Sequence, residues 1–404
     1  MKTCGIVVEY NPFHNGHRYH IEAARKVTGA ELIIAVMSGN FLQRGEPALV
    51  SKFTRTKMAL LGGADLVVEL PYAFSTQMAE VFARGAVQIL SALGCESLCF
   101  GSESGNIEAF QKTLAFLKEF KIQYDELVKN YVKEGYSYPK ANSLAYTNLP
   151  FSNDLVDLTK PNNILGYQYV KAISDLELPM KATTIQRIGA SFHDESLSEV
   201  KIASATGIRN ALFSKDGSVE MIKDQVPEST FQLLKGYIEE FGTFSSWENF
   251  WPFLQYRLLQ TAPKELKTIY EMEEGLENRL LSAVKEAESF HDFMEKIKTK
   301  RYTWTRLQRV LTHVLTNTKR HEMEEAMKKA RYIRLLGANK NGRNYLKEMK
   351  ENFSLPLISK LSAADPELLR LDIRAGEIYS FGYPGFIRRR LLELEFKQPP
   401  IIID

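Results

Sequence analysis

Short apolar segments alternate with helix-length amphipathic segments through the first half of the chain. Four runs are apolar enough for strands covered on both faces, and a fifth segment is typical of a last strand. These segments are residues 3–8, 31–37, 65–70, 97–100 and 181–187. Helices between parallel strands form right-handed crossovers. We therefore expect an α/β fold, with a Rossmann-like doubly wound parallel sheet at residues 1–215 and a mostly α-helical region at residues 216–404.

Length and cysteine content narrow the class of protein. A chain of 404 residues can bury a large core and form two domains. Cys4, Cys95 and Cys99 form no disulfide or zinc pattern, so we expect small buried apolar side chains there. The start of the chain has no signal-peptide pattern, and no apolar run approaches the length of a membrane span. These features favour a reducing cytoplasm.

The first strand leads into a turn and a helix that carry the main candidate site. Asn11-Pro12 and Asn15-Gly16 predict the turn, and residues 18–28 suit a helix. Free N–H groups at a helix start favour a phosphate, and His14 and His17 can donate hydrogen bonds to phosphoryl oxygens. The alternative is a surface turn with two unrelated histidines. Three of the chain's seven histidines, His14, His17 and His20, lie in this segment, which favours a functional role.

A second candidate phosphate site opens a helix near residue 204. Ser204 and Thr206 supply hydroxyls beside free helix-start N–H groups, and Arg209 lies one turn into the helix. A guanidinium can grip phosphate oxygens in a fork that lysine cannot reproduce. An ordinary Ser/Thr helix cap explains the same pattern.

Loops at the predicted carboxyl edge of the sheet hold further candidates. Arg44 is either a phosphate clamp or a solvated charge, and Gly101 is either a close approach for a nucleotide or a plain turn. Asn162 or Asn163 caps a helix or contacts a ligand. The polar segment at residues 189–200 is of a kind that closes over a site.

Positive charge is concentrated in one part of the chain. The net charge is +3 overall, but residues 296–350 carry +12, residues 351–404 carry −1 and residues 1–295 carry −8. Cations mixed with aromatic side chains suit RNA, where they neutralise phosphates and stack on unpaired bases; a solvated helical face is the alternative. The candidate RNA-binding residues are Lys298, Lys300, Arg301, Arg306, Arg309, Lys319, Arg320, Lys328 and Lys329.

His14-Asn15-Gly16-His17, together with the segment at residues 203–209, resembles the HxGH and ISSTxxR-type motif pair of the nucleotidylyltransferase superfamily. Ala203 and Ala205 stand where that motif has serines, so its hydroxyl count is reduced. Residues 5–17, 37–47, 100–103 and 161–166 and the basic helical tail are similar to the bacterial tRNA(Met) cytidine acetate ligase family. This resemblance spans essentially the whole chain.

The resemblance implies an ATP-dependent ligase with an ATP-binding catalytic domain at residues 1–215 and a tRNA-binding region at residues 216–404. Acetate and ATP would form acetyl-adenylate, and the acetyl group would pass to N4 of the wobble cytidine of elongator tRNA(Met). The residues expected to contact ATP are Val7, Val8, Glu9, Tyr10, Asn11, Pro12, Phe13, His14, Asn15, Gly16, His17, Arg18, Tyr19, His20, Gly101, Asn162, Arg187 and Ile188.

In the expected mechanism, an acetate oxygen attacks the α-phosphorus in line. His14 and His17 stabilise the developing charge, while Ser204, Thr206 and Arg209 hold the β- and γ-phosphates. Magnesium is inferred from the chemistry, and no carboxylate stands out as its ligand. Two rivals fit part of the pattern. A nucleotidylyltransferase for a small phosphorylated acceptor leaves the basic segment without a role, and a non-catalytic RNA-binding protein leaves the histidines without one.

Overall fold

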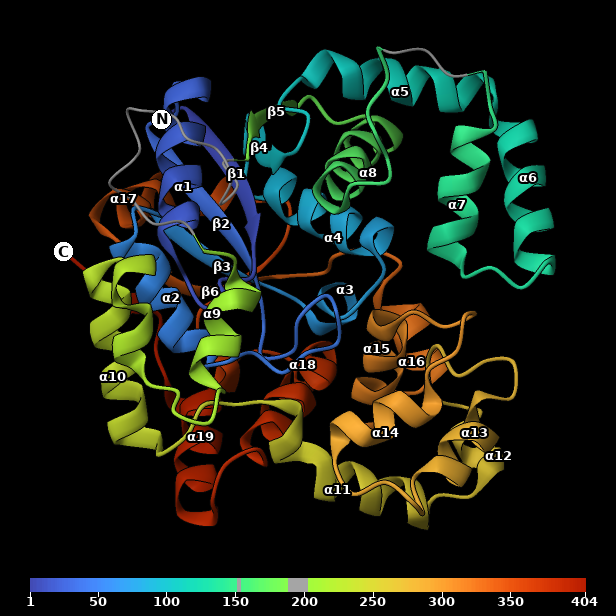
Figure 1. Ribbon diagram of the computed structural model, residues 1–404. Coiled ribbons are helices and arrows are strands. Elements are labelled where there is room, and N and C mark those ends of the chain that lie inside the picture. Colours follow the sequence, from blue (N-terminus) through green and yellow to red (C-terminus); the bar gives the residue numbers. More distant parts are fainter. Residues whose placement is uncertain (151–153, 188–202) are drawn as a thin grey trace.

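The computed structural model describes residues 1–150, 154–187 and 203–404, and within them eight strands form one mixed sheet (Figure 1). The strand order is β5–β4–β1–β2–β3–β6–β7, and β8 pairs with β6. The five strands of the first half are parallel: β1 (Thr3–Val8), β2 (Leu32–Ser38), β3 (Leu66–Leu70), β4 (Ser97–Ser102) and β5 (Lys181–Gln186). The predicted α/β fold with a doubly wound parallel sheet is confirmed in this part.

Alternate residues of each strand face opposite layers of helices. In β2, Ile33 belongs to the core beneath α1 and α2, whereas Ile34 belongs to the core beneath α4 and α8. Both side chains are completely buried, as expected for strands covered on both faces. These helices are α1 (Asn15–Thr28), α2 (Lys52–Leu61), α4 (Ala79–Ala92) and α8 (Pro161–Asp175).

Between β4 and α8 the chain adds three helices, and α6 and α7 project to one side of the sheet (Figure 1). The stretch at residues 134–150, which is rich in Tyr, Asn and Ser, contains α7. A small apolar cluster around Val128, Ala141 and Ala145 joins α6 to α7. The remaining helices of the first half are α3 (Tyr72–Ser75), α5 (Ile107–Glu119), α6 (Lys121–Lys133) and α7 (Tyr138–Thr147).

Helices dominate residues 205–326, and their core is continuous with one face of the sheet. Trp247, Phe250 and Leu311 belong to the same buried cluster as Ile6 of β1. The elements are α9 (Ala205–Leu212), the 3-10 helix η1 (Val219–Gln225), α10 (Glu228–Phe241), α11 (Trp247–Gln260), α12 (Pro263–Leu266), α13 (Leu276–Ala283), α14 (Phe290–Ile297), α15 (Trp304–Leu315) and α16 (Arg320–Ala326).

The structure departs from the expected helical region after residue 330, where the chain returns to the sheet. Strand β6 (Ile333–Ala338) pairs antiparallel with β3, so the sheet is mixed rather than wholly parallel. Strand β6 lies within the basic segment at residues 296–350, and for this reason it was not predicted from the sequence. The other elements are α17 (Lys340–Met349), η2 (Lys350–Asn352), β7 (Leu357–Ile358), η3 (Leu361–Ala363), α18 (Pro366–Ser380), α19 (Gly385–Lys397) and β8 (Ile401–Ile402).

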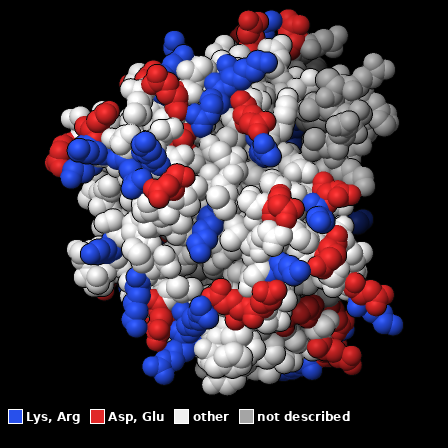
Figure 2. Space-filling view, turned by 90° about the vertical axis from the view of Figure 1, so that its left-hand side faces the viewer, with Lys and Arg blue, Asp and Glu red and all other residues white. Residues whose placement is uncertain are grey.

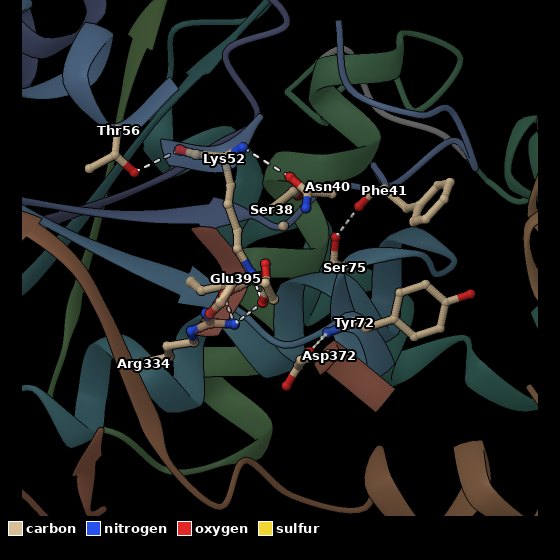
Figure 3. Close-up of polar contacts among 12 residues, drawn as sticks. Ser38, Asn40, Phe41, Lys52, Thr56, Tyr72, Ser75, Arg334, Asp372 and Glu395 are labelled. Atoms are coloured by element: carbon tan, nitrogen blue, oxygen red, sulfur yellow. Dashed lines mark hydrogen bonds and ion pairs between the residues drawn. The ribbon is translucent and has the colours of Figure 1, made fainter. Parts of the chain in front are cut away.

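A buried network of charged side chains joins α19 to the sheet and to α2 (Figure 3). The Lys52 ammonium lies 2.9 Å from Glu69 and 2.7 Å from Glu395, and the Arg334 guanidinium lies 2.9 Å and 2.8 Å from the same two carboxylates. Burial opposes ionisation, but Lys52 and Arg334 hold the pKa of Glu395 below its ordinary value. The network joins α2, β3, β6 and α19 into one unit.

The expectations for cysteines and membrane spans can be compared with the same structure. Cys4, Cys95 and Cys99 are free and buried, as expected. Burial raises the pKa of the Cys4 and Cys95 thiols. Among the described residues, every helix is too short or too polar to cross a membrane.

Candidate active site

The turn between β1 and α1 is closed by two histidines. His14 is the N-cap of α1, and its Nδ1 accepts a hydrogen bond from the Gly16 amide at 3.1 Å. His17 completes a capping box, because its Nδ1 accepts from the His14 amide at 3.2 Å. The two rings stack with centroids 3.7 Å apart. The pair therefore satisfies helix-start amides while it fixes the orientation of both rings.

This arrangement selects one tautomer and one charge state for both rings. Each Nδ1 is an acceptor, so each neutral ring carries its proton on Nε2. Burial, with the Arg187 charge, lowers the pKa of His14 to about 4. Burial, followed by the charges of His14 and Arg187, lowers the pKa of His17 well below its ordinary value. Near neutral pH both side chains are uncharged donors, which suits phosphoryl oxygens.

The second motif reaches the same turn. In α9, Arg209 donates a hydrogen bond to the Asn11 carbonyl at 2.9 Å and pairs with Glu46 at 3.1 Å. The side-chain nitrogen of Asn11 is buried and has no hydrogen-bond partner within the described residues, while its oxygen accepts from the Leu49 amide at 2.7 Å. A buried donor without a protein acceptor is what a site completed by a ligand leaves open.

The hydroxyls of the second motif lie at the surface. Ser204 is the N-cap of α9, and its Oγ accepts from the Gly207 amide at 3.0 Å. Thr206 is exposed in the first turn of the helix. The helix-cap interpretation therefore holds for Ser204 in this structure, and phosphate binding by either hydroxyl stays a prediction.

Three more of the predicted ATP residues lie near the ends of β4 and β5. Gly101 is in β4, Arg187 directly follows β5, and Asn162 belongs to α8. The Cβ of an alanine at Gly101 would lie 3.1 Å from Cγ of Arg187, so the glycine permits close approach of that side chain. Asn162 Nδ2 donates to Glu103 at 2.7 Å, just beyond β4. The N-cap of α8 is Lys160, so the expectation that Asn162 or Asn163 caps this helix is wrong. Glu103 accepts from both asparagine amides and replaces the missing cap.

The other predicted ATP residues follow β1 in order. Val7 and Val8 end the strand, Tyr10 to Phe13 form the turn, and Asn15 to His20 begin α1. Tyr10 and Phe13 are buried in the core beneath the turn. Burial and the Arg187 charge lower the pKa of His20 to about 4. Ile188 and the loop at residues 189–200 lie outside the described residues.

Sequence reasoning missed the residues that hold this edge of the sheet together. Arg55 is fully buried and donates to the Glu9 carbonyl at 2.7 Å and the Ser38 carbonyl at 3.0 Å. It thereby joins the exits of β1 and β2.

Most of the predicted RNA-binding cations are paired with glutamates. Arg309 lies 3.1 Å from Glu271, and both side chains are nearly buried. The other pairs are Arg301–Glu274, Arg306–Glu273, Arg320–Glu273, Lys319–Glu265 and Lys328–Glu325. A strip of acids at residues 265–274 therefore neutralises much of the basic segment. An RNA role for these residues stays a prediction.

Few of the predicted RNA-binding cations remain unpaired. Lys300 and Lys329 are exposed and form no ion pair with a described residue, and Lys298 donates only to the neighbouring Thr299 carbonyl, at 2.6 Å. Figure 2 shows the side of α10 and α17, which lies opposite α14, α15 and α16 in Figure 1, and there basic and acidic side chains are interspersed over the described surface. That face offers no large field of positive charge to a polyanion.

The described residues bring no three His, Cys, Asp or Glu side chains together as a metal-binding group. The donors at the β1–α1 turn are imidazoles, amides and guanidinium groups, which suit an anion. These donors agree with the expected phosphate site, whose assignment to residues 10–17 and 204–209 stays a prediction.

Comparison with known proteins finds relatives that match this chain over its whole length. The family model described as HIGH Nucleotidyl Transferase matches residues 1–392. The tRNA(Met) cytidine acetate ligase of Halalkalibacterium halodurans is 50% identical over 408 residues, covering 100% of this chain and 98% of that protein. The ligase of Bacillus subtilis strain 168 is 46% identical with the same coverage.

A solved structure agrees in fold over the full length. Thermotoga maritima TmcAL bound with alpha-thio ATP is 35% identical, with a TM-score of 0.89 and coverage of 100% of this chain and 99% of that one. The structure of the same protein without ligand has a TM-score of 0.90 at 36% identity. The resemblance found in the sequence is confirmed: this chain belongs to the tRNA(Met) cytidine acetate ligase family of HIGH nucleotidyl transferases.

Proposed function

We propose that this protein uses ATP to activate acetate and transfers the acetyl group to N4 of the wobble cytidine of elongator tRNA(Met). One observation carries the proposal. Arg209 of the second motif bonds to the turn that His14 and His17 close, so both motifs face one site. Related proteins over the full length carry the name of this ligase, and one was solved with an ATP analogue.

In the first step, an acetate oxygen attacks the α-phosphorus and the bond to the bridging oxygen of pyrophosphate breaks. The Nε2–H groups of His14 and His17 donate to the phosphoryl oxygens as negative charge grows there. Arg209, with Ser204 and Thr206, holds the β- and γ-phosphates of the leaving group. Neutral imidazoles suit this task because they need not lose a proton during the step.

Magnesium, when bound with the nucleotide, neutralises charge on the phosphates. The described residues offer no ready cluster of carboxylates for it. Arg187 and Arg209 would orient the triphosphate from the protein side.

In the second step, the cytidine N4 attacks the acetyl carbonyl, the bond to the AMP oxygen breaks, and N4 loses a proton. We propose residues 1–215 as the catalytic part and residues 216–404 as the tRNA-binding region, within which residues 331–404 also complete the sheet. Lys298, Lys300 and Lys329 are the proposed RNA-binding cations that are exposed and form no ion pair with a described residue. A protein that acts on tRNA and ATP belongs in the cytoplasm.

The test is a single incubation of protein, ATP, labelled acetate and total tRNA. Nuclease digestion should release labelled N4-acetylcytidine from elongator tRNA(Met), and omission of tRNA should leave acetate-dependent ATP–pyrophosphate exchange. Exchange that requires a phosphorylated acceptor instead of acetate would favour a nucleotidylyltransferase. Nucleotide binding without any turnover would favour a non-catalytic RNA-binding protein.

A further inference from the structure

The β2–α2 loop, residues 39–51, touches both motifs of the nucleotide site. The Gln43 amide donates to Glu9 at 2.7 Å, at the exit of β1. Glu46, the residue directly before Pro47, pairs with Arg209 at 3.1 Å. The loop therefore spans the distance between the two phosphate-binding segments.

The opposite side of the same loop is held by the helical region. The Gly45 carbonyl accepts from Trp247 Nε1 of α11 and from Thr312 Oγ1 of α15, each at 2.9 Å. Gly45 has φ +74°, and a Cβ there would lie 2.3 Å from the backbone nitrogen of Arg309. Any larger residue would clash with α15. The loop is thus a direct bridge between the nucleotide site and the helices proposed to bind tRNA.

Internal hydrogen bonds hold the tip of the loop in one shape. The Leu42 amide donates to the Glu46 carbonyl, and the Gly45 amide donates to the Leu42 carbonyl, each at 2.9 Å. Phe41 and Pro47 form an antiparallel bridge at its base. A side chain carried on this tip is positioned before any ligand arrives, which lowers the entropy lost on binding.

Arg44 is the residue at that tip. Burial raises the pKa of the Glu9 carboxyl, and the charge of Arg44 acts against that larger effect. Arg44 is exposed, and it forms no hydrogen bond or ion pair with any described residue. Its neighbours Gln43, Gly45 and Glu46 all make the contacts given above. Arg301, Arg306 and Arg309, by contrast, are each paired with a glutamate. Arg44 is thus a cation left available where the two halves of the molecule meet.

The geometry suits a phosphate of the RNA backbone. A cytidine that reacts at the β1–α1 turn carries a phosphate on each side, and the loop tip that holds Arg44 is tied to the exit of β1 by the bond from the Gln43 amide to Glu9. A guanidinium binds phosphate in a fork and carries a full charge at any working pH. We propose that Arg44 binds a backbone phosphate beside the reacting cytidine and positions that base for acetyl transfer. This inference rests on the proposed function.

The test separates the two half-reactions in the full-length protein. In Arg44→Ala, we expect kcat/KM for acetylation of elongator tRNA(Met) to fall about 10- to 100-fold, the range for loss of a charge-assisted hydrogen bond. Acetate-dependent ATP–pyrophosphate exchange without tRNA should keep its wild-type KM for ATP. Arg44→Lys should restore part of the loss, because it keeps the charge but not the fork. Lys112→Ala, which removes an exposed cation on α5, should change neither reaction.

Salt dependence distinguishes a phosphate contact from a structural role. The slope of log kcat/KM for tRNA against log salt should become shallower by about 0.7 to 0.9 in Arg44→Ala, the value for one phosphate contact. The loss should persist with an isolated anticodon stem-loop as substrate, because the proposed contact lies beside the reacting base.

Three results would overturn the inference. A raised KM for ATP in the exchange reaction would make Arg44 a nucleotide clamp. An unchanged salt slope, or a loss that disappears with the stem-loop, would remove the contact from the neighbourhood of the cytidine. In each case wild-type acetylation of tRNA would leave the proposed function standing, whereas absence of acetylation by the wild-type protein would refute that function itself.

Discussion

Arg209 donates a hydrogen bond to the carbonyl of Asn11, a residue 198 positions earlier, at 2.9 Å. A second N–H of the Arg209 guanidinium donates to Glu46, and its other N–H groups can donate to a ligand. A long-range bond of this kind fixes α9 against the β1–α1 turn. The relative position of the two motifs proposed to bind phosphate is therefore fixed by the protein itself.

Arg209→Lys should weaken ATP use without unfolding the protein. One ammonium cannot reach the Asn11 carbonyl, Glu46 and a phosphate in the fork geometry of arginine. We expect kcat/KM for ATP in the exchange reaction to fall about 10- to 100-fold, from the loss of charge-assisted hydrogen bonds. Steady-state exchange at varied ATP measures it, with Glu46→Gln as the milder control. Equal activity of Arg209→Lys and wild type would contradict the role given to the fork.

His14→Asn separates the structural and chemical roles of His14. Asparagine is a good N-cap and should preserve the start of α1, but it has no Nε2–H to offer a phosphoryl oxygen. We expect exchange activity to fall about 100-fold or more, the scale for removal of one oxyanion donor, with little change in thermal stability. His14→Ala should lose both. A variant that is inactive only because it unfolds would show up in the melting curve.

Acid should destabilise the protein through its buried histidines. The folded-state pKa of His14 is about 4, below the ordinary 6.5, so the unfolded chain binds the proton first as pH falls. Stability from this group is present above pH 6.5 and decreases toward pH 4. Between pH 7 and pH 5 the loss is about 2 kcal/mol for His14 alone. Urea unfolding at both pH values should show a smaller acid loss in His14→Asn than in wild type.

Lys52→Met should be strongly destabilising. It leaves Glu69 and Glu395 buried with only Arg334 as a counter-charge, and loss of one partner from a buried ion pair costs about 3 to 5 kcal/mol. The double variant Lys52→Met with Glu395→Gln restores charge balance and should be less destabilised than the single variant. Denaturant unfolding of the two variants decides the point, and a double variant as unstable as the sum of its parts would contradict coupling.

Unpaired lysines should matter more for RNA than paired arginines. Replacing Lys298, Lys300 and Lys329 together with alanine should make the salt slope of tRNA binding shallower, because free cations release counterions from phosphates. Arg309→Ala should instead lower stability, since Glu271 would be left nearly buried without a partner. Filter binding over a salt series, paired with melting curves, compares them. An unchanged slope in the triple variant would move the tRNA surface elsewhere.

Local patterns in the sequence predicted the nucleotide half of the molecule well. The apolar runs that became β1 to β4 are short and continuous, which is typical of strands buried on both faces. The turn at His14 and His17 was predicted because proline, asparagine and glycine restrict the backbone there. These signals depend on residues close together in the chain.

Long-range features escaped the same reasoning. The pairing of Arg309 with Glu271 crosses 38 positions, so a net charge counted along the sequence overstated the free positive surface. Strand β6 was concealed because its apolar residues lie among cations, one of which, Arg334, is buried by ion pairs. Arg55 has no local signal, because its role depends on carbonyl groups supplied by two separate strand exits.

The antiparallel pairing of β6 with β3 has a consequence for biosynthesis. A nascent chain that has emerged only as far as residue 330 already contains every motif proposed to bind ATP, yet one edge of β3 is still without its neighbour. An uncovered strand edge invites pairing with other chains. During translation the growing polypeptide is therefore open to aggregation, and in need of chaperone protection, until residues 333–338 leave the ribosome.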